Sequence, residues 1–225
     1  MSQSNAHIVI DALKAAGVTQ LFSLSGNQIL SLYDATIGRD LDIIHVRHEA
    51  AAVFMADAWG RLTEQPGVAL LTAGPGHCNA LAAVYVAQMS ESPVVLLSGH
   101  CPATQVGTGA FQEIDQVAVT TPVAKAAWLV DRPDRIADDV ARALAIAGEG
   151  RPGPVHLSLP VDVLEGEVEA QTEHADTVEE TRRLSDEAVE AILQRLAAAS
   201  RPLILSGSAM GRPQRWQDNT SADGM

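Results

Sequence analysis

The sequence of 225 residues is poor in basic and aromatic residues. It holds 15 Lys and Arg against 28 Asp and Glu, which gives a formal net charge of -13. Proteins that bind a nucleic acid backbone gather Lys and Arg against its phosphates, so this charge argues against a nucleic acid partner. Aromatic residues make up 4% and hydrophobic residues 47% of the chain, which is a globular composition and not that of a disordered protein.

Cysteine and long apolar runs are also scarce. The two cysteines, Cys78 and Cys101, form no Cys-x-x-Cys pair, so we expect neither a disulfide framework nor a cysteine metal site. No apolar stretch approaches the ~20 residues that span a bilayer, because Gly, Pro, Ser and Glu interrupt every candidate. The first five residues are polar and show no secretory signal. The sequence therefore predicts a cytoplasmic protein without a membrane partner.

The motifs of several enzyme classes are absent as well. The sequence has no Gly-x-Ser-x-Gly nucleophile elbow and no Gly-Lys-Ser/Thr phosphate loop. Its histidines do not show the spacing of metal ligands, so no metal site is expected. The turn at 74–76, Gly-Pro-Gly, fails as a dinucleotide fingerprint because Asn79 takes the place of the third small residue and Pro75 has no N–H to donate.

What the sequence does contain is an alternation of short apolar runs with helix-like segments. The expected strands lie at 21–24, 42–46, 67–72, 93–98, 123–130 and 153–159, and the expected helices at 5–16, 29–37, 48–64, 79–91 and 133–147. This alternation predicts an α/β fold, a parallel sheet with helices on both faces. Ligands of such sheets collect at the carboxyl ends of the strands. Glu49, the 74–76 turn and the loop after Ser98 each follow a strand end, so we expect them to converge.

The last quarter of the sequence changes character. Residues 165–181 are acidic and low in large apolar side chains, which is typical of a linker. We expect a first domain at 1–164, an acidic linker at 165–184, and at 185–225 the truncated start of a central α/β domain with a disordered tail. In that last part, the sequence predicts a helix at 185–199 capped by Ser185 and an apolar strand at 202–205.

Glu49 is the residue with the most chemical promise. It follows the apolar run at 43–46 and stands at the start of a helix-like stretch. A carboxylate between a buried strand and a helix is desolvated by the first and favoured by the N-terminal dipole of the second, so it can manage a proton. A Glu in the first turn of an ordinary helix, however, commonly does no more than complement the dipole. The surrounding motifs therefore decide between the two interpretations.

Four segments supply that context. The first two are Ser-Gly-Asn at 25–27 and Arg-His-Glu-Ala-Ala-Ala at 47–52. The other two are Thr-Ala-Gly-Pro-Gly-His-Cys-Asn-Ala at 72–80 and Ala-Phe-Gln-Glu-Ile-Asp-Gln at 110–116. In this order and spacing the set resembles the pyrimidine-binding domain of thiamine-diphosphate-dependent enzymes, in particular the acetolactate synthase-like group. The resemblance covers about residues 5 to 165.

The resemblance implies a role for each motif. Glu49 would bond to the N1' atom of the aminopyrimidine ring of thiamine diphosphate and share the proton whose movement activates the cofactor. Thr72, Pro75 and Asn79 would line the pyrimidine pocket. Gln112 would face the reacting centre as a second catalytic residue. The full set that the resemblance assigns to cofactor or catalysis is Gly26, Asn27, Glu49, Thr72, Pro75, Asn79 and Gln112.

The implied activity is decarboxylation of a 2-keto acid followed by carboligation. Family members hold the diphosphate and Mg²⁺ with a Gly-Asp-Gly motif, and this sequence contains no Gly-Asp-Gly. We therefore expect the Mg²⁺ ligands outside this chain, which would be the N-terminal part of such an enzyme and inactive alone. A homo-oligomer, or a chain carrying the diphosphate-binding domain, would be its partner, and a 2-keto acid its substrate. FAD occurs in the family, but nothing in this sequence supports it.

Two departures from the family pattern keep alternatives open. The turn at 25–28, Ser-Gly-Asn-Gln, replaces the Pro-Gly-Gly of biosynthetic acetolactate synthases, which leaves the acceptor substrate undecided. The loop from Gly99 lacks the paired histidines of simple decarboxylases, which favours carboligation. The alternatives are a non-catalytic fragment that serves as a binding or dimerisation module, and one subunit of a split lyase or decarboxylase.

Overall fold

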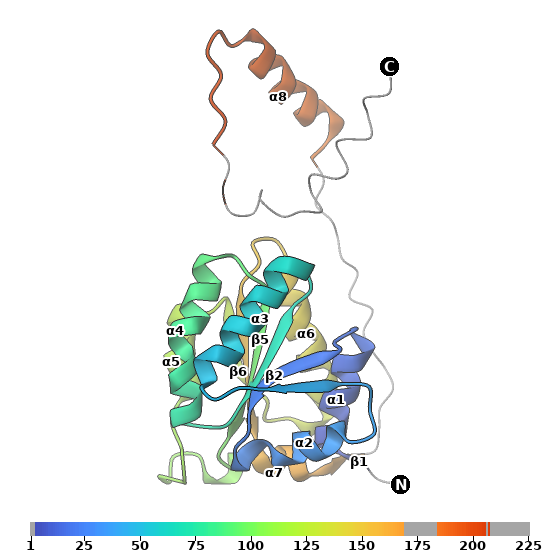
Figure 1. Cartoon of the computed structure of the whole chain (residues 1–225), viewed down its shortest axis with the longest axis vertical. Helices are drawn as coiled ribbons and strands as arrows, with labels where there is room; N and C mark the ends of the chain where they lie inside the picture. The colour runs from blue at the N-terminus through green and yellow to red at the C-terminus, as the bar shows by residue number, and fades with distance from the viewer. Residues whose placement is uncertain (1–2, 169–183, 206, 208–225) are drawn as a thin grey trace.

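A computed structural model describes residues 3–168, 184–205 and 207. Its main feature is a six-stranded sheet (Figure 1). The strands of this sheet are β2 (Gln20–Leu24), β3 (Asp42–His45), β4 (Gly67–Leu71), β5 (Val94–His100), β6 (Ala126–Leu129) and β7 (Pro154–Pro160). Their spatial order is β3-β2-β4-β5-β7-β6, and every neighbouring pair is parallel. Two short strands, β1 (Gln3–Ser4) and β8 (Glu167–Val168), pair with each other in antiparallel fashion.

Helices cover both faces of the sheet. They are α1 (Asn5–Ala15), α2 (Leu30–Thr36), α3 (Glu49–Thr63), α4 (Pro75–Met89), α5 (Gln116–Thr120), α6 (Ile136–Gly148) and α7 (Val161–Glu165). Short 3₁₀ turns are η1 (Asn27–Ile29), η2 (Ala103–Gln105), η3 (Thr121–Val123) and η4 (Pro133–Arg135). Helices α1, α2, α6 and α7 contribute to one hydrophobic core, and α3 and α4 to a second core across the sheet (Figure 1). The predicted α/β fold is confirmed.

The central strands explain why the sheet forms. Every residue of β4, β5 and β7 is buried. A parallel strand covered on both faces by helices needs a continuous apolar run rather than an alternating one, and β4 (Gly-Val-Ala-Leu-Leu) has such a run. Small residues let the helices approach closely. A Cβ added at Gly67 would lie 2.1 Å from the backbone oxygen of Ala56 in α3.

Strand β3 differs from its expected environment. The sequence predicts a buried strand before Glu49, but β3 lies at the edge of the sheet, and Ile43 and Ile44 are half-buried. The reason is topological, because β3 has β2 as its single neighbour. The desolvation expected at Glu49 is therefore partial, and the side chain of Glu49 is half-buried.

Two element boundaries also move. Helix α4 begins at Pro75 and not at the expected Asn79, because a proline is tolerated in the first helical turn, where its missing N–H is not needed. Strand β6 begins at Ala126 rather than at 123, since Thr121–Val123 form a 3₁₀ turn. The earlier start of α4 brings the Gly-Pro-Gly turn into the helix N-terminus, where it matters for the site.

The residues after β8 are described in part. Helix α8 (Asp186–Ala198) forms as predicted, and Ser185 caps it by accepting a hydrogen bond from the N–H of Ala188 at 3.2 Å. The strand predicted at 202–205 is wrong, because these residues show no regular structure and their apolar side chains are exposed. Most of the expected linker and the expected tail, residues 169–183 and 208–225, lie outside the described residues. The domain boundaries stay predictions.

In the parts of the chain that the structure describes, no helix combines the length and apolarity needed to cross a membrane.

Candidate functional site

The candidate site is built at the carboxyl ends of β2, β3 and β4. Glu49 is the first residue of α3, and the helix begins there because His48 caps it: the N–H of Ala50 donates to His48 Nδ1 at 3.1 Å. The amide of Asn79, in the second turn of α4, donates to Oε2 of Glu49 at 3.0 Å. Two residues that are 30 positions apart in the sequence are thus in direct contact.

The turn at 74–76 brings Gly76, at the start of α4, close to the same carboxylate. A Cβ added at Gly76 would lie 2.6 Å from Cγ2 of Thr72 and 3.3 Å from Oε1 of Glu49. The hydroxyl of Thr72 donates to Oε1 of Gln28 at 2.7 Å. Gly26 also packs on Thr72, and a Cβ added at Gly26 would lie 2.3 Å from the threonine Cβ. Glycine at 26 and 76 therefore lets the backbone pack closely on Thr72 and, at position 76, near the carboxylate of Glu49.

Gln112 reaches this region through its backbone. It has a left-handed φ of 60°, and its carbonyl oxygen would lie 2.5 Å from a Cβ at Gly74. Gly74 itself has φ 56° and ψ -113°, a conformation that favours glycine. The loop that carries Gln112 is held by Glu113, whose carboxylate accepts hydrogen bonds from the N–H groups of Gly107 and Ala110. These bonds, the one from Gly107 first, lower the pKa of Glu113.

The structure therefore groups most of the predicted site residues. Glu49 and Asn79 are bonded, Thr72 and Gly26 are in contact, and Gln112 packs on the turn that starts α4. The remaining two, Asn27 and Pro75, lie exposed in the same turns. Among the described residues, no hydrogen bond joins either of them to Glu49.

Two buried amides were not assigned from the sequence. Gln28 is 4% exposed and accepts the Thr72 hydroxyl bond, and Gln116 is 1% exposed and bonds to Gly74. The available signal was their position, because Gln28 directly follows the Ser-Gly-Asn turn and Gln116 ends the segment at 110–116. A glutamine in a strand-end turn is commonly exposed, so position alone did not distinguish them.

Two buried histidines lie beneath the site. The rings of His77 and His156 are 4.4 Å apart. Burial lowers the pKa of His77 to about 4 and holds the pKa of His156 well below its ordinary 6.5. In the described part of the chain, no group of three or more His, Cys, Asp or Glu residues could hold a metal ion. These histidines therefore act as neutral hydrogen-bonding groups.

The buried histidines predict a loss of stability in mild acid. The unfolded chain binds a proton at each histidine near pH 6.5, whereas the folded chain does so only at lower pH. The free energy of unfolding should thus be at its full value above pH 6.5 and fall by up to ~1.4 kcal/mol per pH unit for each histidine as the pH decreases towards 4. Urea unfolding at pH 7.5, 6.0 and 5.0 measures this slope.

Two matched variants test whether His77 causes this pH dependence of the free energy of unfolding. His77→Gln replaces the imidazole with an amide, which can bond the same neighbours but does not titrate, so the slope of this variant should be shallower. His45→Gln removes a histidine at an exposed strand end and serves as the control. Equal slopes for the wild type and His77→Gln would contradict the assignment to His77.

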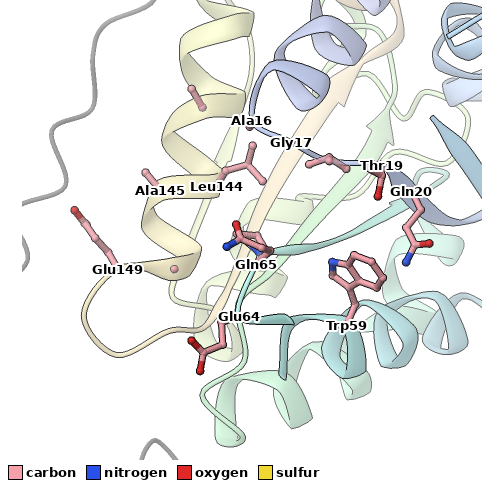
Figure 2. A pocket seen from close by; sticks show the side chains of 14 residues that line it. Ala16, Gly17, Thr19, Gln20, Trp59, Glu64, Gln65, Leu144, Ala145 and Glu149 are labelled. Carbon is pink, nitrogen blue, oxygen red and sulfur yellow. The ribbon is translucent and has the colours of Figure 1, made fainter. Parts of the chain in front are cut away.

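A cavity of about 650 Å³ lies at the other end of the sheet. It is lined by residues that precede β2 and β4 and by the last turns of α3 and α6. Figure 2 shows Trp59 on one wall and Leu144 on the opposite wall, with Glu64 and Glu149 also among the lining residues. This cavity contains none of the predicted site residues. The candidate site is instead an open surface, where Pro75 and Asn79 are exposed.

Comparison with known proteins agrees with this geometry. Residues 4–119 match the family described as thiamine pyrophosphate enzyme, N-terminal TPP binding domain. The chain belongs to this family. It is 36% identical over 209 residues to the catabolic acetolactate synthase of Raoultella terrigena, a match that covers 93% of this chain and 37% of the relative.

Two further relatives are similar. Over 163 residues the chain is 42% identical to the acetolactate synthase isozyme 3 large subunit of Escherichia coli, with 72% of this chain and 28% of the relative covered. Over 168 residues it is 41% identical to 2-hydroxyacyl-CoA lyase 2 of Xenopus laevis, with 73% and 26% covered. The chain thus spans about a third of the length of the relatives that it matches.

Proposed function

We propose that this chain supplies the aminopyrimidine side of a thiamine diphosphate site in an enzyme that decarboxylates a 2-keto acid and transfers the remaining acyl unit to an acceptor. The observation that carries the proposal is the carboxylate of Glu49, which is bonded by Asn79 and approached by Gly76, a residue without a side chain. Gly26, Asn27, Thr72 and Pro75 belong to the turns around it. We assign them to the cofactor pocket, and Glu49 and Gln112 to catalysis.

The residues present fit an aminopyrimidine ring. Such a ring needs a carboxylate to share a proton with its ring nitrogen, and space for a flat group beside that carboxylate. Oε2 of Glu49 is occupied by the Asn79 amide, which leaves Oε1 for the ring. A side chain at Gly76 would crowd Oε1. In the described residues Glu49 forms no ion pair with Lys, Arg or His, so no cation competes for its charge.

The chemical role proposed for this chain is proton exchange at one oxygen of Glu49. Oε1 of Glu49 would bind N1' and exchange a proton with it, while the Asn79 bond fixes the carboxylate plane. When bound, the cofactor supplies the electron sink for the electrons released as the carboxyl group leaves the 2-keto acid.

The open site supports the proposal of a partner. Asn79 and Pro75 are exposed, and α3 and α4 carry further exposed apolar side chains, among them Phe54, Tyr85 and Met89. Exposed apolar groups beside a functional site are typical of an interface. We propose that a diphosphate-binding domain, on a second copy or on another chain, packs there and brings the Mg²⁺ ligands. A non-catalytic binding module remains the alternative.

A second candidate reaction is cleavage of a 2-hydroxyacyl-CoA. The 41% identity to the Xenopus laevis lyase favours it, since that identity is close to the 42% shared with the E. coli synthase. Both reactions would use Glu49 in the same way. They differ in their substrates, which Gln112 and Asn27 would face from the loops beside the carboxylate.

The proposal predicts that this chain alone binds thiamine diphosphate weakly and only through its aminopyrimidine ring. Thiamine diphosphate added to the ¹⁵N-labelled chain should shift the amide signals of Gly26, Thr72, Gly76 and Asn79, with a Kd of about 1 mM or weaker, because half of the contacts are missing. Mg²⁺ should not change this Kd. Inorganic pyrophosphate, which lacks the ring, is the control ligand and should leave these signals unmoved.

Two results would count against the proposal. Shifts elsewhere in the domain, with none near Glu49, would contradict the assigned site. Micromolar, Mg²⁺-dependent binding by the chain alone would contradict the proposal that the Mg²⁺ ligands come from elsewhere.

A further inference from the structure

We infer that Gln116 is a positioning residue for this site: its buried side-chain amide holds the turn at 74–76 in the shape that places Gly76 and Asn79 against Glu49. The effect on cofactor binding rests on the proposed function, whereas the hydrogen bonds that hold the turn do not depend on it. Gln116 is the first residue of α5 and does not touch Glu49, so its effect is transmitted through the backbone of the turn.

The side chain of Gln116 ties three strand ends together. Its Oε1 accepts the backbone N–H of Gly74 at 2.9 Å, just after β4. Its Nε2 donates to the carbonyl of Gly99 in β5 at 3.1 Å and to the hydroxyl of Ser158 in β7 at 3.0 Å. One acceptor and two donors are thus all used, in a side chain that is 1% exposed. A buried amide with full pairing has a fixed orientation.

This orientation cannot be reversed without cost. Exchanging the oxygen and nitrogen of the amide would place an N–H group against the N–H of Gly74 and an oxygen against the carbonyl of Gly99. Both contacts would then be repulsive, which assigns the amide as described. The assignment also fixes the next bonds. Ser158 accepts from Gln116 and so donates to Nε2 of His156, whose Nδ1–H donates to the carbonyl of Leu96.

A second chain of hydrogen bonds links Gln116 to the start of α4. The hydroxyl of Thr120 donates to the backbone oxygen of Gln116 and therefore accepts from Nε2–H of His77. Nδ1 of His77 then accepts from the hydroxyl of Ser98. His77 lies in the first turn of α4, so both the side chain and the backbone of Gln116 are linked to the segment that follows Gly74.

Gly74 needs such a tie. Its backbone has a positive φ and its N–H is buried, so without Gln116 this donor would be left unpaired. The backbone oxygen of Gln112, in the same segment as Gln116, packs against the position that a Cβ of Gly74 would take. Residues 112 and 116 thus both contact the turn at Gly74. The shape of this turn then determines where Gly76 and Asn79 lie relative to Glu49.

The test compares Gln116→Met with Ser158→Ala in the full 225-residue chain. Gln116→Met keeps the length of the side chain but removes all three bonds. Ser158→Ala removes one partner of Gln116 and leaves a buried histidine nitrogen unpaired, yet keeps the bond to Gly74. Both should lower the midpoint of urea unfolding. Only Gln116→Met should speed amide hydrogen exchange at 74–79 relative to β5, by roughly 10- to 100-fold, the ratio expected for a buried donor left unpaired.

The same variants are titrated with thiamine diphosphate. The Kd obtained from the shifts at Gly76 and Asn79 should rise at least about fivefold in Gln116→Met. In Ser158→Ala it should stay unchanged. Unchanged exchange at 74–79 in Gln116→Met would overturn the inference. Faster exchange with unchanged cofactor shifts would also overturn it, by leaving Gln116 a purely structural residue. If the wild type itself gives no shifts, the proposed function fails, whereas the exchange data still decide whether Gln116 holds the turn.

A measurement on the wild type covers the case in which Gln116→Met does not fold. A through-hydrogen-bond coupling between the amide nitrogen of Gly74 and the side-chain carbonyl carbon of Gln116 should be detectable. The backbone bonds between β4 and β5 provide the positive control. Couplings in the sheet without one at Gly74 would contradict the tie.

Discussion

Replacing Glu49 with Gln should abolish turnover while leaving the domain folded. Gln has the same shape, accepts the Asn79 bond through its oxygen, and removes a charge that is half exposed, so the free energy of unfolding should change little. An amide does not exchange a proton with a ring nitrogen at neutral pH. Positioned acid–base groups contribute ~10²–10⁴ in rate, and we expect a loss of about 10³-fold or more.

Turnover requires a complete site, so the assay uses a hybrid enzyme. In the hybrid, residues 1–164 of this chain replace the matching N-terminal region of the E. coli relative, with which the chain is 42% identical over 163 residues. Glu149→Gln, the same change at an exposed carboxylate at the other end of the sheet, is the control and should keep activity. A Glu49→Gln hybrid as active as this control would rule out a catalytic role for the carboxylate.

Replacing Gly74 with Ala should be the most damaging single change to the fold of the site. The backbone of Gly74, with φ 56° and ψ -113°, costs an L-residue at least the ~1–2 kcal/mol of the left-handed helical region. The added Cβ would also meet the backbone oxygen of Gln112 at 2.5 Å, and crowding of this kind costs ~1–3 kcal/mol more. The two effects together predict a loss of about 2–5 kcal/mol in the free energy of unfolding, measured with urea.

Gly150→Ala separates the two contributions. Gly150 has nearly the same φ, 53° against 56°, but an added Cβ there has no atom within 4 Å. This control should lose only the conformational part, ~1–2 kcal/mol. Equal losses for the two variants would mean that the Gln112 loop moves aside freely, and would weaken the case that residue 112 packs firmly on the turn.

The fold follows from the sequence to a large extent, because parallel strands covered on both faces demand long apolar runs. The run from Val94 onward could be identified in this way without a structure. The environment of β3 could not, since its apolar residues look the same whether the strand is central or at an edge. Strand order depends on contacts between distant segments, and local patterns do not record them.

The candidate site shows the same division. The sequence predicts Glu49 from its place at a strand end and from the surrounding motifs, and the turn at 74–76 from its glycines. The contact between Glu49 and Asn79 depends on α3 and α4 lying side by side, which no local pattern fixes. Gln116 was missed as a functional residue for a similar reason. Its importance comes from three partners in three different strand ends, and these meet only in the folded chain.

The most direct test of the central claim is the exchange rate of the C2 proton of thiamine diphosphate bound to the hybrid enzyme, with and without Glu49→Gln. If Glu49 shares a proton with the aminopyrimidine ring, the wild-type hybrid should exchange this proton rapidly, and the variant should bind the cofactor but exchange about 10³-fold more slowly. Exchange at the wild-type rate in a folded, cofactor-bound Glu49→Gln variant would contradict the account.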